Sequence, residues 1–179
     1  MGKSLKALDV AKVFLHFSNE NRTAMDCDDV TPMKLQKLLY YAQGNYLAEY
    51  GEELFKEKIY RWEYGPVVRE VYDVYKSCGR NEIIEHDTVN SVDVEYLPFL
   101  SRIYNDYGKY TASQLSTMTH RETPWLETQQ NKEIKKTLIK SFFSKIFEEK
   151  MEKTVSEVDK QIVEYKEFSL EDLKKLTDV

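Results

Sequence analysis

The sequence predicts a mainly α-helical protein. We expect a single helical domain of about six helices, a small two- to three-stranded antiparallel β element, and a C-terminal helical appendage. In several segments the apolar residues recur at three- and four-residue steps, as they do along one face of a helix. The β-prone stretches are only about four residues long. Apolar residues make up 41% of the 179 residues, which is enough for a packed core.

The first two helices are predicted from their apolar faces and from a clear start signal. Leu5–Ser18 carries apolar residues at helical spacing. The second helix starts where Thr31 can cap it and Pro32 fits its first position. Gly51 can end it in a left-handed conformation. Gly44 inside this helix costs about 1 kcal/mol relative to alanine, and we therefore expect a packing reason for it, such as the close approach of another backbone.

The middle of the chain is predicted to hold short strands and a short helix. A polar loop is expected over Asn19–Asp29, a strand over Ile59–Trp62, and a turn at Gly65 that leads into a helix over Pro66–Ser77. A second short strand is expected over Glu82–Glu85. The helix is expected to bury Val67, Val71, Val74 and Tyr75.

The rest of the domain, up to residue 150, is predicted to consist mainly of helices. Residues 151–179 hold more acidic than basic residues, so we expect an acidic, partly helical extension with a helix over Leu170–Leu176. Three helices are expected before it. The first runs from about Asp93 or Glu95 to Asp106, the second over Ala112–Met118 with Thr111 as cap, and the third over Lys132–Lys150 with Asn131 as cap. Thr119–Trp125 is expected to be non-helical.

Composition and missing motifs argue against several classes of function. No apolar run approaches the roughly 18–20 residues that span a bilayer, so we expect no membrane association. Without a secretion signal, Cys27 and Cys78 are expected to be reduced thiols of a cytoplasmic protein. His16, His86 and His120 lack metal-ligand spacing, and the glycines form no phosphate loop. We therefore predict no metal, no cofactor and no catalytic residue.

Three segments combine polar or geometrically restricted residues with large aromatic residues. The first is Thr31–Gln43, which is either a core helix with a solvated polar face or a surface that presents polar side chains to a partner. The second is Trp62–Val68, which is either a connector or a turn that places Tyr64 as a clamp. The third is Leu115–Trp125, in which His120 either holds the loop by hydrogen bonds or makes a functional polar contact.

Together the three segments resemble the SocA-like, or Panacea, domain, first catalogued as a phage-associated GepA-like domain. The family pattern is close to T-P-x-K-L-Q-K-L-L-Y-Y-A-Q, then W-x-Y-G-P-V-V, then Y-G-x-(Y/F)-(S/T)-A-x-x-L, T-H and P-W. All three blocks occur here in the same order. The resemblance covers about Leu5–Lys150.

The resemblance implies a largely helical domain with a small β element. It also implies the antitoxin half of a toxin–antitoxin pair of bacteria, phages or prophages. Members neutralise toxins by direct protein–protein binding, and one member is a proteolytic adaptor that hands its toxin to a Clp protease. The partners implied are therefore a cognate protein toxin and a Clp protease. The tail after Lys150 lies outside the family's core and is expected to influence the choice of partner.

The residues at motif positions fall into two predicted groups. Those with a predicted structural role are Thr31, Pro32, Trp62, Gly65, Pro66, Pro124 and Trp125. Those predicted to bind the partner are Lys34, Gln36, Lys37, Tyr40, Gln43, Tyr64 and His120.

Two other functions stay open at this point. The first is a DNA-binding regulator, although the net charge of −5 argues against strong phosphate binding. The basic residues that could form a patch on a shared helix are Lys34 and Lys37, or Lys132, Lys135, Lys136 and Lys140. The second is an enzyme, which would require Tyr64 and His120 to meet in a cleft.

Tyrosine is unusually frequent, with 13 residues against two Trp. A tyrosine side chain combines a large apolar ring with a polar hydroxyl, which suits interfaces. Several tyrosines belong to the family pattern. The others are predicted to be specific to this chain's partner, and examples are Tyr46, Tyr50, Tyr60, Tyr72 and Tyr75.

Overall fold

The computed structural model describes residues 4–20, 29–84 and 92–177, with side chains up to residue 160. It confirms the predicted fold class: the described residues form seven α-helices and one two-stranded antiparallel sheet. The chain divides into two compact units, Met1–Ser144 and Lys145–Val179. Cys27, His86 and most of the predicted loop before the second helix lie outside the described residues. The functional division predicted at residue 150 stays a prediction.

Helix α2 (Pro32–Tyr50) has the ends that the sequence predicts. The hydroxyl of Thr31 accepts a hydrogen bond from the Lys34 N–H (3.3 Å), and Gly51 ends the helix with φ +74°. Gly44 has the packing reason that the sequence predicts. A Cβ at this position would lie 2.3 Å from the Phe143 ring, so a side chain approaches the helix here rather than a backbone.

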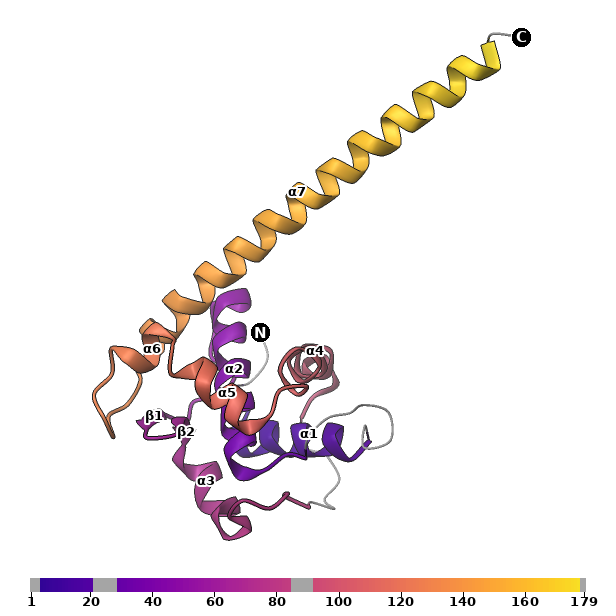
Figure 1. The fold of residues 1–179 in the computed structure, drawn as a ribbon. Helices are drawn as coiled ribbons and strands as arrows, with labels where there is room; N and C mark the ends of the chain where they lie inside the picture. The colour runs from indigo at the N-terminus through magenta and orange to yellow at the C-terminus, as the bar shows by residue number, and fades with distance from the viewer. Residues whose placement is uncertain (1–3, 21–28, 85–91, 178–179) are drawn as a thin grey trace. The chain divides into compact units, whose positions relative to one another are not determined.

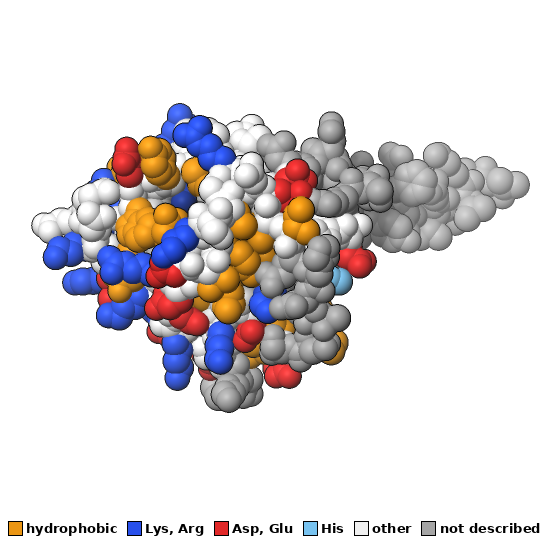
Figure 2. Space-filling view, turned by 90° about the horizontal axis from the view of Figure 1, so that it is seen from below, with side chains coloured by type: hydrophobic (Ala, Val, Ile, Leu, Met, Phe, Trp, Pro, Cys, Tyr) orange, Lys and Arg blue, Asp and Glu red, His pale blue; other side chains and the backbone are white. Residues whose placement is uncertain are grey.

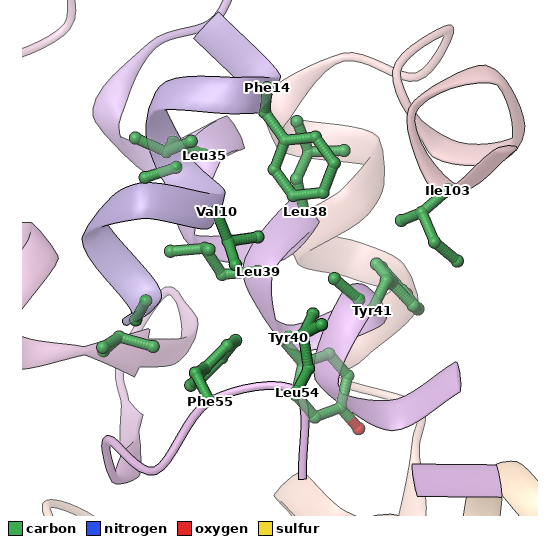
Figure 3. Packing of buried hydrophobic residues seen from close by; sticks show 14 of the residues in the cluster. Val10, Phe14, Leu35, Leu38, Leu39, Tyr40, Tyr41, Leu54, Phe55 and Ile103 are labelled. Carbon is green, nitrogen blue, oxygen red and sulfur yellow. The ribbon is translucent and has the colours of Figure 1, made fainter. Parts of the chain in front are cut away.

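Helix α2 is the central element of the first unit (Figure 1). It contacts α1 (Ala7–Glu20), α3 (Arg69–Tyr75), α4 (Leu97–Tyr107), α5 (Ala112–Thr119) and strand β2. The core between these elements combines aliphatic and aromatic side chains (Figure 3). Those labelled in the figure are Val10, Phe14, Leu35, Leu38, Leu39, Tyr40, Tyr41, Leu54, Phe55 and Ile103.

The sheet is a tight hairpin of β1 (Ile59–Trp62) and β2 (Gly65–Val68). Strand β1 is confirmed, but β2 occupies residues predicted to begin a helix. All four residues of β2 are buried, and a buried pair of adjacent β-branched valines suits a strand better than a helix. Helix α3 therefore starts only at Arg69. Val74 was also predicted wrongly, because its side chain is exposed.

The second edge of β1 is covered by residues 131–134. The Arg61 N–H donates to the Lys132 carbonyl (2.9 Å), and the Ile134 N–H donates to the Ile59 carbonyl (2.8 Å). This segment replaces the predicted strand over residues 82–85, since residues 82–84 are not a strand and Glu85 lies outside the described residues. Asn131 has φ +62°, which suits a turn and not a helix cap.

The remaining elements differ from the predictions mainly at their ends. The 3₁₀ turns span Lys76–Cys78 and Val94–Tyr96. Helix α5 begins with Thr111 in a capping box, as its cap prediction requires. Residues Thr123–Leu126 form the short helix α6, which the sequence did not predict, because Pro124 lies in the first turn where its missing N–H is not needed.

Helix α7 spans Lys136–Thr177, so the C-terminal extension is helical beyond the predicted turns. Its start lies after the predicted one, since residues 131–134 pair with β1 instead. Among the described helices, none combines the length and the apolar character that a bilayer crossing needs.

Candidate functional site

The backbone of the hairpin is held on one side by polar side chains of α2. The ammonium of Lys37 donates to the Pro66 carbonyl (3.1 Å). The side-chain oxygen of Gln36 accepts from the Val68 N–H (2.7 Å). Both side chains are buried. Side chains of helix α2 therefore fix strand β2 by binding backbone groups of the strand.

The other side of the hairpin is held by α5 and α6. Nε2 of His120 lies 2.8 Å from the Glu63 carbonyl oxygen, and the Ser116 hydroxyl donates to the Tyr64 carbonyl (3.0 Å). The indole N–H of Trp125 donates to the carbonyl of Trp62 (3.2 Å). Three consecutive carbonyls at the turn are thus bound by side chains of one distant segment, which fixes the turn in place.

His120 holds the turn by hydrogen bonds, which is one of the two roles that the sequence suggested for it. Its Nδ1 lies 2.5 Å from the Ser116 carbonyl, and its ring lies against Trp125 with centroids 4.1 Å apart. Both ring nitrogens face backbone carbonyl oxygens, so both are occupied by contacts within the protein. A ring bound in this way does not favour the general-base role that the enzyme hypothesis needs.

Gly65 is the point where the hairpin, α2 and α5 meet. Its φ of +107° is strained for any residue with a side chain. A Cβ there would lie 2.6 Å from Cε of Lys37 and 2.8 Å from the Thr119 hydroxyl oxygen. The glycine of the hairpin is therefore required by its backbone conformation and by the buried Lys37 and Thr119 side chains beside it.

The hairpin presents the side chain of Tyr64 to solvent. Tyr64 is 65% exposed, although its carbonyl is bound by Ser116. Glu63 beside it is also exposed. Because the backbone is fixed, the ring projects from a rigid base. Exposed tyrosines on rigid elements are typical of protein–protein contacts.

A pocket of about 490 Å³ lies between the start of α2 and the hairpin. Its walls combine aromatic, aliphatic and polar side chains. The lining residues are Pro32, Met33, Gln36, Lys37, Trp62, Glu63, Tyr64, Val67, Tyr72, Gly79, Gln130 and Asn131. The pocket thus joins residues of two motif segments.

The prediction that polar residues of α2 form a surface is wrong. Lys34, Gln36, Lys37, Tyr40 and Gln43 are all buried. The physical reason is that the hairpin and the segment around Phe55 cover this face of the helix and offer backbone partners to Gln36, Lys37 and Gln43. The Gln43 amide, for example, donates to the Phe55 carbonyl (3.0 Å) and accepts from the Phe55 N–H (3.1 Å). Of the residues predicted to bind the partner, Tyr64 is exposed and His120 is partly exposed.

Burial moves the pKa values of Lys37 and Glu122 to about 7. It lowers the pKa of Lys37 to about 7, because the charged ammonium loses its hydration. It also raises the pKa of Glu122 to about 7. One oxygen of Glu122 accepts from the Tyr41 hydroxyl (2.8 Å). Its other oxygen and the nearby Tyr40 hydroxyl are buried without a hydrogen bond of normal geometry.

The predicted basic patch on α2 is also wrong, since Lys34 and Lys37 are buried. Lys136 pairs with Glu53 (2.8 Å), and Lys140 donates to the Gly51 carbonyl (3.2 Å). The face shown in Figure 2 mixes Lys and Arg with Asp and Glu around hydrophobic side chains. Among the described residues of that face, acidic side chains lie beside the basic ones, which does not indicate a nucleic-acid site.

The tyrosines predicted to be partner-specific lie in different environments. Tyr50 is exposed and contacts Tyr46, with ring centroids 4.5 Å apart. Tyr72 packs edge-on against Trp62, and Tyr60 lies under the guanidinium of Arg69. Tyr75 is buried. Most of this group therefore contributes to packing.

Ser116 is a site residue that the sequence did not single out for this role. It precedes His120, the C-cap of α5, by four residues, so the two side chains lie on the same side of the helix. That spacing is the signal that could have linked Ser116 to the turn. Arg61, stacked 3.8 Å above the Trp125 ring, was also missed.

Comparison with known proteins places the chain in a family. The model of the antitoxin SocA-like, Panacea domain matches residues 35–126, about half of the chain, and the chain belongs to this family. One similar protein is Antitoxin SocA of Caulobacter vibrioides (strain NA1000 / CB15N). It is 28% identical over 136 residues, which cover 69% of this chain and 70% of that protein. No solved structure matches the chain significantly.

Proposed function

We propose that this chain is a cytoplasmic antitoxin that neutralises a cognate protein toxin by direct binding, with the tip of the β1–β2 hairpin as the docking surface. One observation supports the hairpin tip as the docking surface. Side chains of α2, α5 and α6 bind the hairpin backbone at five residues, and the tip presents an exposed Tyr64.

A fixed tip supports binding for an energetic reason. Ordering a loop at an interface costs free energy, and a loop that is already ordered avoids that cost. A tyrosine ring also offers much contact area for few rotatable bonds. The hairpin combines both properties, and the two α2 side chains that hold it, Gln36 and Lys37, are buried.

Delivery of the toxin to a Clp protease is a second step that we propose for the same complex. Binding alone would leave the toxin intact, whereas an adaptor would shorten its lifetime. Measuring toxin half-life in cells with and without the Clp protease separates the two. A half-life that does not depend on the protease would contradict the adaptor step and leave neutralisation by binding.

Co-expression tests the function itself. The protein encoded beside this chain's gene is expressed alone and together with the chain. We expect the chain to restore growth and to copurify with that protein. Unrestored growth together with no complex would contradict the proposed function.

A further inference from the structure

Lys37 is a buried cation in the wall of the pocket between α2 and the hairpin. Its side chain is 1% exposed. An ammonium has three N–H donors, and one of them is bound by the Pro66 carbonyl (3.1 Å). Among the described residues, no carboxylate forms an ion pair with it. A buried charge without a counter-ion is costly, and its pKa of about 7 reflects that cost.

The polar groups near Lys37 form their hydrogen bonds with partners other than its ammonium. The Gln36 oxygen accepts from the Val68 N–H, and the Thr119 hydroxyl donates to the Ser116 carbonyl (2.8 Å). Glu63, the acidic residue of the pocket lining, is exposed to solvent. Among the residues that the structure describes, Pro66 supplies the one acceptor of this ammonium, so two of its donors are left for an oxygen from a partner.

We propose that this pocket receives an acidic side chain of the toxin, whose carboxylate pairs with the ammonium of Lys37. The inference rests on the proposed function and specifies its partner. The adjoining toxin backbone would lie against the aromatic wall, where Tyr72 packs edge-on against Trp62 with ring centroids 4.9 Å apart. Tyr64 at the tip borders the same pocket, so the two surfaces form one continuous site.

The pairing predicts that binding depends on pH. A carboxylate beside Lys37 favours the charged ammonium, so the complex takes up a proton when it forms near neutral pH. The toxin carboxylate stays ionised above about pH 5. Binding should therefore strengthen as the pH falls from 9 to 6.5. The charged or titratable groups that face the pocket with Lys37 are Glu63, Tyr64 and Tyr72.

The test measures toxin affinity by calorimetry for the wild-type chain and for Lys37→Met at pH 6.5 and 9. We expect wild-type binding to weaken about tenfold or more at the higher pH. We expect Lys37→Met to bind about tenfold or more weakly at pH 6.5, with little dependence on pH. Wild-type affinity and pH dependence in Lys37→Met would overturn the pairing.

Two controls keep the test interpretable. Lys37→Met preserves chain length and removes a buried charge, and its fold is checked by urea denaturation. If that variant does not fold, NMR titration of the Lys37 Cε signal in the wild-type chain replaces it, and a pKa that does not rise in the complex overturns the pairing. A wild-type chain that binds no toxin would instead overturn the proposed function.

Discussion

The two ends of α2 stabilise their surroundings in different ways. From Pro32 to Gln43 the helix buries polar side chains, which bind the backbone of β2 and of Phe55. From Gly44 to Tyr50 it contacts α4 through aromatic rings, with Tyr46 edge-on to Phe99 at 5.1 Å between centroids. One end fixes backbone geometry, and the other end packs side chains.

The difference explains why the first motif is rich in polar residues. A polar side chain that binds a backbone group specifies where that backbone lies, whereas an aromatic contact tolerates small shifts. The hairpin tip needs a defined position if it is the docking surface. The motif on α2 is thus a set of internal supports, and the exposed residue that they support lies on another element.

The largest expected effect comes from breaking a polar support. Gln43→Leu removes both hydrogen bonds to Phe55 and leaves its N–H and carbonyl buried without partners. We expect a loss of about 3 kcal/mol in the free energy of unfolding. Urea denaturation at neutral pH measures it. A loss below about 1 kcal/mol would show that these hydrogen bonds do not stabilise the backbone as described.

A smaller effect is expected at Glu122, next to Tyr40 and Tyr41. Its pKa is higher in the folded chain, about 7, than in the unfolded chain. Its contribution to stability is therefore complete below about pH 4.5 and is lost as the pH rises through 7. Glu122→Gln stays neutral, and its amide can donate to the Tyr40 hydroxyl. We expect the variant to be more stable than wild type at pH 8.5, by on the order of 2 kcal/mol.

The same comparison at pH 4 serves as the control for Glu122→Gln. Both chains are neutral at this position there, so their unfolding free energies should differ little. A stability difference that is equal at pH 4 and pH 8.5 would contradict the ionisation of Glu122 as its cause.

The smallest effect is expected at the aromatic end of α2. Arg102 forms a partly exposed ion pair with Glu49, in which one guanidinium nitrogen lies 2.6 Å from each carboxylate oxygen. Exposed ion pairs contribute about 0–1 kcal/mol. Arg102→Gln should lower the unfolding free energy by less than about 1 kcal/mol in urea denaturation. A loss as large as that of Gln43→Leu would erase the contrast between the two ends.

The sequence predicted the fold class, α2 with both its ends, and β1, because those signals are local. Thr31-Pro32 and Gly51 act through neighbouring residues of the same helix. It did not predict β2, since Gly65–Val68 becomes a strand by pairing with β1 and is held there by the Gln36 side chain of α2. The cover of β1 by residues 131–134 is equally non-local.

The sequence predicted which residues belong to the candidate site, but not which of them are buried and which are exposed. Lys37 and Gln36 lie off the leucine face of their helix, which in isolation indicates exposure to solvent. They are buried because the hairpin folds over them, and one sequence does not reveal which element covers a helix face. The turn that contains Tyr64 led to the prediction that this residue is a clamp. Its side chain is exposed, so the role stays a proposal.

The most direct test of the docking surface compares two exposed tyrosines, Tyr64 at the hairpin tip and Tyr50 at the aromatic end of α2. Alanine is placed at each position, and toxin affinity is measured alongside unfolding free energy. We expect Tyr64→Ala to weaken binding about tenfold or more without a loss of stability, while Tyr50→Ala binds like wild type. Wild-type affinity in Tyr64→Ala, or a greater loss in Tyr50→Ala, would contradict the hairpin tip as the docking surface.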